Sequence, residues 1–232
     1  MENVISQKLF LYLVIIFSAV FHEYAHGWAA YQLGDTTAKD AGRLTLNPLR
    51  HLDPIGTVII PLFLLFTSGI FIGWAKPVPY NPNNLRDQKY GNLKVGVAGP
   101  LANLLIAILL AALSFILPIQ AATKTSITAI IGSGYVGRAM EIAGSLNNPL
   151  VLFFVLICVI IYINIFLALF NLIPLPPLDG SKIFFDLFPR QRHYLERIGF
   201  IGIFLALFLA FYFLAPLARL IFWFIAGQGL GI

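Results

Sequence analysis

Four long stretches without a charged residue constrain this 232-residue chain more than any other feature. No Asp, Glu, Lys or Arg occurs in residues 54–75, 95–123, 142–178 or 198–218. Each stretch is long enough to cross about 30 Å of hydrocarbon, which takes roughly 20 helical residues. With 59% hydrophobic and only 11% charged residues, the chain lacks the composition of a soluble globular protein. The sequence therefore predicts a protein embedded in a lipid bilayer.

The apolar runs and the helix-breaking residues around them predict four helices, at residues 8–33, 95–118, 149–172 and 198–224. The first run resembles a signal peptide in its polar start, but it has no convincing cleavage site and it carries a chemical motif, so we expect it to be kept as a helix. We expect one all-α, polytopic membrane domain over residues 1–232. Three transmembrane helices would form its core, with the fourth helix at the C-terminal side.

Segment 55–73 is also apolar, but its proline and glycine residues leave open whether it spans the membrane or turns back. If it spans, the basic residues divide 9 to 6 between the two sides. If it is re-entrant, loops 34–94 and 174–197 share a side and hold 11 basic residues against 4. Cytoplasmic loops are enriched in Lys and Arg, so the second count favours a re-entrant, β-strand-like region inside a cytoplasmic-side loop 34–94. The net charge of +5 then reflects membrane topology rather than nucleic-acid binding.

A metalloprotease-type motif lies inside the first predicted helix. The sequence reads His22-Glu23-Tyr24-Ala25-His26, and histidines four residues apart project from one helix face about 6 Å apart along the axis. Both imidazoles can therefore bind one metal ion. Zinc suits the pair because it accepts imidazole nitrogen and keeps a fourth position for water when three protein ligands bind. Glu23 is placed to take a proton from that water and pass it to the leaving amine.

The motif needs a third ligand, and Asp179 is the best candidate among the six Asp and four Glu residues of the chain. It follows an apolar helix and a proline-rich strap that forces extended backbone, while Gly180 permits a tight turn. A helix-capping Asp in an interfacial loop is the plain alternative. In the re-entrant topology His22 lies roughly 16 Å from the inner end of its helix, and Asp179 approaches from the cytoplasmic side. We expect His22, His26 and Asp179 to hold one zinc ion per chain.

Three motifs together resemble those of the site-2 proteases, a family of intramembrane zinc metalloproteases. They are H-E-x-x-H at 22–26, G-P-L-A-N at 99–103 and N-x-x-P-x-P-x-L-D-G at 171–180, in the family's order and approximate spacing. The stretches 42–48 and 73–79 look like those of the compact bacterial and archaeal subgroup, which has no PDZ domain. The resemblance covers most of the chain.

The resemblance implies a role for each motif residue. His22, His26 and Asp179 would bind zinc, and Glu23 would be the catalytic base. Asn171 would help to hold the substrate backbone or the transition-state oxygen. The same resemblance implies a multi-pass protein of a prokaryotic cell membrane, and the count of basic residues puts the active site nearer the cytoplasmic face.

Several polar residues near the motifs have two interpretations. Asn103, on the second predicted helix, either faces the site as a substrate-binding or transition-state group or forms an interhelical hydrogen bond. His51 and Asp53 are placed to contact a metal or substrate, but capping and orienting the loop is the simpler role. The stretch 119–148 is weakly amphipathic, and we expect it at the outer face. The single cysteine, Cys158, lies mid-run and packs as a small apolar residue.

We therefore expect an intramembrane zinc metalloendopeptidase that hydrolyses peptide bonds within or near transmembrane segments, with Glu23 activating a zinc-bound water. Its partners would be a membrane-spanning protein substrate and the lipid bilayer. Segment 74–82 would receive an unwound substrate by strand addition. The alternatives are a zinc-binding membrane scaffold and an ion or metal transporter without proteolytic activity. Glu23 disfavours a transporter, which has no need of a glutamate beside the first ligand.

Overall fold

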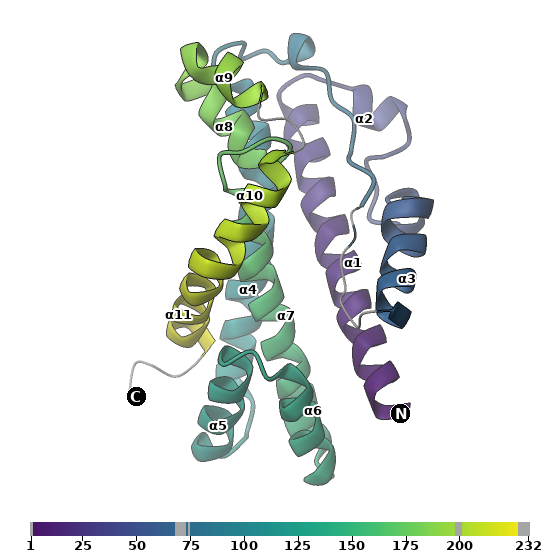
Figure 1. Ribbon diagram of the computed structural model, residues 1–232, viewed down its shortest axis with the longest axis vertical. Helices are drawn as coiled ribbons and strands as arrows, with labels where there is room; N and C mark the ends of the chain where they lie inside the picture. The colour runs from purple at the N-terminus through teal and green to yellow at the C-terminus, as the bar shows by residue number, and fades with distance from the viewer. Residues whose placement is uncertain (1, 68–72, 74, 198–200, 227–232) are drawn as a thin grey trace.

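The computed structural model describes residues 2–67, 73, 75–197 and 201–226, and within these residues it contains helices and no strand (Figure 1). Four helical stretches are long and apolar enough to cross a membrane. They lie in α1 (Glu2–Gln32), α4 (Gly91–Ile116), α7 (Pro149–Asn171) and the C-terminal stretch, in which α10 (Ile201–Leu209) continues through the π-helical η5 (Ala210–Leu214) into α11 (Ala215–Ala226). The four helices predicted from the sequence are therefore confirmed, with ends displaced by a few residues.

Most of the shorter helices gather at the two ends of the bundle (Figure 1). One end carries α2 (Thr37–Asp40), η1 (Pro48–Arg50), η3 (Pro82–Asn84), α8 (Asp179–Leu187), η4 (Pro189–Gln191) and α9 (Arg192–Glu196). The other end carries α5 (Ala121–Gly132) and α6 (Val136–Ser145), beside the start of α1. The end of α1 and the start of α4 therefore share an end of the molecule.

Helix α7 is the most buried of the four long helices, and it packs against α4, α5, α6 and α11. Its start is set by Asn148, whose side chain accepts the backbone N–H of Leu150 at 3.0 Å, and by Pro149 in the first helical position. Phe154, Ile161 and other fully buried apolar side chains fill the core around it. Large apolar residues on the outer faces of the long helices stay exposed, as expected for surfaces that meet lipid.

Stretch 119–148 forms the hairpin of α5 and α6 at the end opposite α8. Its Lys124 is 4% exposed, and its Nζ donates to the carbonyl oxygens of Ser114 and Phe115, at 3.0 Å each. These carbonyls belong to the last turn of α4, where a positive charge offsets the negative end of the helix dipole. The hairpin therefore caps the C-terminal end of α4 through Lys124.

Residues 54–67 form the π-helical η2 (Pro54–Ile59) followed by α3 (Ile60–Thr67), which lies alongside α1 (Figure 1). Residues 68–72 and 74 of the apolar and proline-rich segments lie outside the described residues. Described residues 75–81 have no regular secondary structure, so no strand is found where a β-strand-like region was expected. Since α1 ends and α4 begins at one end of the bundle, η2 and α3 lie within a segment that starts and finishes there.

The residues before η2 do cap and orient their loop, as the simpler interpretation predicted. The Asp53 carboxylate accepts the backbone N–H groups of Ile55 and Gly56 at 3.0 and 2.6 Å. Nε2 of His51 lies 2.8 Å from the carbonyl oxygen of Thr45, and the His51 carbonyl accepts the N–H of Lys76. Asp53 is thus an N-cap, and His51 connects two stretches of the connecting segment.

Candidate metal centre

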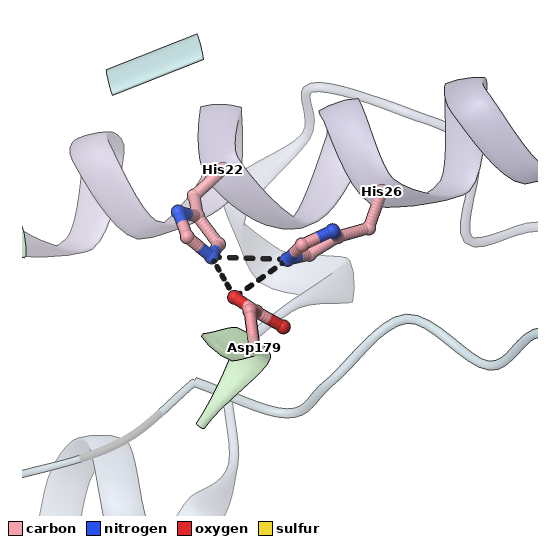
Figure 2. A group of neighbouring side chains, drawn as sticks. All are labelled: His22, His26 and Asp179. Atoms are coloured by element: carbon pink, nitrogen blue, oxygen red, sulfur yellow. Dashed lines mark hydrogen bonds and ion pairs between the residues drawn. The ribbon is translucent and has the colours of Figure 1, made fainter. Parts of the chain in front are cut away.

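Both histidines of the first helix point to one place beside α4 and α8 (Figure 2). His22 and His26 are 6% and 5% exposed, and their Nε2 atoms lie 3.0 Å apart. Because the residues are four apart on an α-helix, they share a face, as their spacing predicted. The bilayer-length helix thus carries two imidazoles that turn the same ring nitrogen toward each other.

The third group is Asp179, the first residue of α8. Its Oδ2 lies 2.8 Å from Nε2 of His22 and 3.0 Å from Nε2 of His26 (Figure 2). The proline-rich strap after α7 brings it there, and its turn requires Gly180: a Cβ at this position would overlap the carbonyl oxygens of Leu172 and Ile173. Three residues from two distant parts of the chain thus meet at one point.

Each histidine is held by a hydrogen bond on its other ring nitrogen. Nδ1 of His22 lies 2.5 Å from Oδ1 of Asn103, and Nδ1 of His26 lies 2.6 Å from the carbonyl oxygen of Val95. A carbonyl oxygen only accepts, so both Nδ1 atoms carry the proton. Both Nε2 atoms are then free of hydrogen in the neutral rings. This is the tautomer that a metal-binding histidine needs.

The orientation of the Asn103 amide is itself fixed by a buried polar network between α1, α4 and α7. Nδ2 of Asn103 donates to Oδ1 of Asn164 at 2.7 Å and points to the Ser18 carbonyl at 3.4 Å. Nδ2 of Asn164 donates to the Ile160 carbonyl and to Oγ of Ser18. With its nitrogen held by acceptors, the Asn103 amide can present only its oxygen to His22. Asn103 thus forms the interhelical hydrogen bond of its second interpretation and orients His22, while its role toward a substrate stays a prediction.

The donor set fits a cation. Two hydrogen-free imidazole nitrogens and a carboxylate oxygen, each about 3 Å from the others, bring lone pairs together in a buried place, and only a positive charge between them relieves that repulsion. Imidazole nitrogen and carboxylate oxygen are ligands that zinc accepts in catalytic sites. Gly99 of α4 leaves room there, because a Cβ on it would lie 2.5 Å from both Nε2 atoms. An ion of this kind therefore suits the residues present.

A lysine that the sequence analysis did not single out completes the charge balance. Nζ of Lys182 donates to Oδ1 of Asp179 at 2.8 Å, so the carboxylate keeps only Oδ2 for the histidines. Burial lowers the pKa of the Lys182 ammonium, but the Asp179 carboxylate and two weaker electrostatic neighbours together raise it more, and the net pKa lies above its ordinary value. Lys182 also lies 5.5 Å from the ring centre of Tyr80. The lysine therefore stays charged beside the donor set.

Glu23 lies on the same helix and faces the segment before α4. Its Oε2 accepts the backbone N–H of Val78 at 2.7 Å, while its Oε1 has no hydrogen-bond partner among the described residues. Val78 is 6% exposed and lies against Gly27, where a Cβ would come within 2.9 Å of the valine side chain. Gly27 thus lets Val78 lie close to α1, where the Val78 N–H holds one oxygen of Glu23. The other oxygen stays available.

Comparisons with known proteins agree with this geometry. Peptidase family M50 matches residues 10–215, which is most of the chain. The chain belongs to this family of site-2 proteases. No solved structure matches significantly.

Curated relatives of this M50 peptidase are named as zinc metalloproteases. "Putative zinc metalloprotease YwhC" of Bacillus subtilis is 36% identical over 223 residues, which cover 94% of this chain and 86% of the relative. "Putative zinc metalloprotease Rip2" of Mycolicibacterium smegmatis is 31% identical over 99 residues, which cover 43% of this chain and 37% of the relative. The resemblance noted in the sequence is therefore confirmed, and a zinc metalloprotease is supported over a transporter or a scaffold.

Not every residue expected at the site of this M50 peptidase lies against the donor set. Asn171 is the last residue of α7, and its Nδ2 donates to the carbonyl of Leu167 in its own helix at 3.0 Å. Its role toward a substrate stays a prediction. The sequence analysis missed Lys182, Asn164 and Ser18. Only Lys182 left a signal, since it follows Asp179 by three residues at the start of a helix.

Proposed function

We propose that the chain is an intramembrane zinc metalloendopeptidase that hydrolyses peptide bonds within or near transmembrane segments of membrane proteins, as in regulated intramembrane proteolysis. The observation that carries this proposal is the convergence of Nε2 of His22, Nε2 of His26 and Oδ2 of Asp179 at one buried point, with Glu23 on the same helix. His22 lies ten residues before the end of α1, which corresponds to roughly 15 Å along the axis. A substrate peptide bond would therefore be met at membrane depth.

Zinc, when bound, supplies a Lewis acid that lowers the pKa of a coordinated water toward neutrality. The residues of the chain orient the ligands and transfer the proton. Asn103 and the Val95 carbonyl hold the imidazoles in the binding tautomer, and Lys182 occupies the second oxygen of Asp179. Glu23 takes a proton at Oε1 and passes it to the leaving amine, while the Val78 N–H fixes its other oxygen.

The extended segment 75–81 is suited to lie beside a substrate in the site. The side chain of Arg43 donates to the carbonyl oxygens of Lys76 and Pro77, and the Val78 N–H is bonded to Glu23. The segment thus runs past the proposed base without belonging to any helix or sheet. An unwound substrate helix has unpaired backbone groups that such a segment can satisfy. We retain strand addition as the expected mode of substrate binding.

Glu23→Gln tests the proposal. The amide keeps the shape of the side chain but cannot take up a proton, so cleavage of a membrane-spanning reporter should fall by at least about a hundredfold. Zinc bound per purified chain should stay at the wild-type level, because Glu23 is not one of the three donors. Elemental analysis and reporter cleavage in the same membranes measure both quantities.

The matched control is Glu141→Gln on α6, an exposed glutamate at the other end of the bundle. It should change neither quantity. Retained cleavage in Glu23→Gln would contradict the proposed base. Absence of zinc from the purified wild-type protein would contradict the metal centre, and zinc without any cleavage would favour the scaffold alternative.

A further inference from the structure

A pocket of about 550 Å³ opens beside the segment that contacts Glu23, away from the metal centre. Its polar lining is cationic: Arg43, Arg50 and Lys76 border it, and no carboxylate does. The other described residues that line it are Ala41, Leu49, Leu52, Pro77 and Pro79. Three positive charges without a counter-charge repel one another, so a bound anion would stabilise the pocket.

Arg43 carries a buried donor without a partner among the described residues. The residue is 9% exposed, and its Nη2 donates to the carbonyl oxygens of Lys76 and Pro77 at 2.8 and 3.4 Å. Its Nε is buried and has no hydrogen-bond partner among the described residues. A buried guanidinium that is paired only with backbone carbonyls is costly, and buried donors in native proteins are nearly always satisfied. An anion in the pocket would provide both the charge and the acceptor.

The two carboxylates that adjoin lining residues in the sequence, Asp40 and Asp53, are occupied elsewhere. Asp40 accepts the hydroxyl of Thr36 at 2.7 Å, and Asp53 caps η2 through the N–H groups of Ile55 and Gly56. Neither lines the pocket. The protein itself therefore leaves the charge of the pocket unneutralised.

The surroundings of the pocket indicate which anion fits. Leu49, one of its lining residues, is 74% exposed, and the adjoining apolar helix exposes Ile55, Ile59 and Phe63 by 57%, 59% and 64%. A free anion would gain nothing from such a surface. A ligand with an anionic head and hydrocarbon tails would use both the cations and the apolar side chains, as lipids do in basic pockets at a membrane surface.

We propose that this pocket binds the phosphate of an anionic phospholipid headgroup, with the acyl chains along η2 and α3. The forked guanidinium of Arg43 suits phosphate oxygens, and Arg50 and Lys76 add charge. The site also touches the proposed chemistry, because the carbonyls that Arg43 holds belong to the two residues directly before Val78, the partner of Glu23. Lipid in the pocket would therefore steady that segment against the base, a consequence that rests on the proposed function.

The test uses the full-length protein purified in phosphatidylcholine nanodiscs. Short-chain phosphatidylglycerol, short-chain phosphatidylcholine and inorganic phosphate serve as probes, and binding is measured by native mass spectrometry. Each cation near a membrane surface strengthens lipid binding about fivefold, so Arg50→Gln or Lys76→Gln should weaken phosphatidylglycerol binding about fivefold, and the double variant roughly 25-fold. Neither side chain makes a hydrogen bond or ion pair among the described residues, so the variants should keep wild-type zinc content.

Arg190→Gln is the matched control, because it removes one exposed positive charge from the same end of the bundle outside the pocket. It should leave phosphatidylglycerol binding unchanged. If the double variant bound phosphatidylglycerol as well as the wild type, or if Arg190→Gln lost as much binding, the pocket would not be the binding site. Equal binding of phosphatidylcholine would overturn the selectivity for an anion. If inorganic phosphate bound as tightly as phosphatidylglycerol, the proposal that the bound phosphate belongs to a lipid would be wrong. None of these outcomes depends on whether the protein cleaves a substrate.

Discussion

The two histidines of the metal centre are held in the same tautomer by different partners. A backbone carbonyl fixes His26, whereas His22 depends on the amide of Asn103 and, through it, on Asn164. A backbone carbonyl cannot be removed by substitution, but the amide can. The two sides of the metal centre therefore differ in their sensitivity to mutation.

Asn103→Ala should weaken zinc binding by about 10- to 100-fold, the usual effect of losing a partner that orients a ligand. The loss should appear in a competition titration with a zinc chelator. Ser114→Ala removes a buried polar group from the same helix, far from the donors, and should leave zinc affinity unchanged. Equal zinc affinity in Asn103→Ala and the wild type would show that the network does not orient His22.

Gly99→Ala should strongly reduce the zinc bound per chain. It should lower the thermal unfolding midpoint much less. The added methyl group would lie 2.5 Å from both Nε2 atoms, in the place where an ion would be bound. Gly144→Ala is the control, since nothing lies within 4 Å of the Cβ it would add. Zinc per chain and the thermal unfolding midpoint should be measured for both variants. Full zinc content in Gly99→Ala would contradict the position of the ion inferred from the donor atoms.

The sequence predicted the three donors because each follows a local rule. Spacing on one helix places His22 and His26 on one face, and the strap with Gly180 returns Asp179 toward them. The groups around the donors follow no local rule. Asn164 meets Asn103 only because α7 and α4 pack in one particular register, and Val95 takes part through its carbonyl, which every residue has. Such contacts become visible only in three dimensions.

At the scale of the elements, Asp35 fastens the end of α1 to the segment that leads into α4. Its fully buried carboxylate accepts hydrogen bonds from Thr37, Asn81 and Asn84. Burial alone raises the pKa of this carboxyl, but the hydrogen bonds lower it more, and the net pKa lies below its ordinary value. A group with a lowered folded-state pKa stabilises the fold above its unfolded pKa and loses that effect as the pH falls through the folded value.

Asp35→Asn should therefore lower stability at neutral pH by about 1–3 kcal/mol, because it leaves buried donors unsatisfied. The difference from the wild type should shrink as the pH falls below about 4, the ordinary pKa of this carboxyl in the unfolded chain, toward the lower pKa of the folded state. Unfolding midpoints measured across this pH range check both statements. Asp40→Asn, at an exposed neighbour, should change stability little at any pH. If the stability advantage of the wild type over Asp35→Asn grew as the pH fell, the role of Asp35 in connecting α1 to the segment before α4 would be contradicted.

The helices were predictable to different degrees for a physical reason. The long ones are set by apolar length and by breakers at their ends, so the predicted ranges match α1, α4 and α7 closely. Residues 54–67 were harder, because a short apolar run with proline fits several structures. The Asp53 cap and the π-helical start of η2 depend on hydrogen bonds that the residue pattern alone does not specify.

For the whole molecule, the placement of the ends makes topology testable with single cysteines. Cys158 is buried, so it provides a silent background for added thiols. Asp40→Cys and Asn83→Cys should react with a membrane-impermeant thiol reagent from the same side, because the described residues between them hold one apolar helix of less than spanning length. Ser145→Cys, at the end of α6, should react from the opposite side. Labelling of Asp40→Cys and Asn83→Cys from opposite sides would show that the segment spans, against the re-entrant topology.

The distance along the chain between the donors has a consequence for how the protein is made. His22 and Asp179 are 157 residues apart, with α4 and α7 between them. A ribosome that has synthesised only the first two long helices has produced both histidines but not the aspartate. The set is complete only when the third long helix and the strap have followed. Proteolytic capacity, on the proposed function, would thus be acquired only late in translation, after the third long helix and the strap have been made.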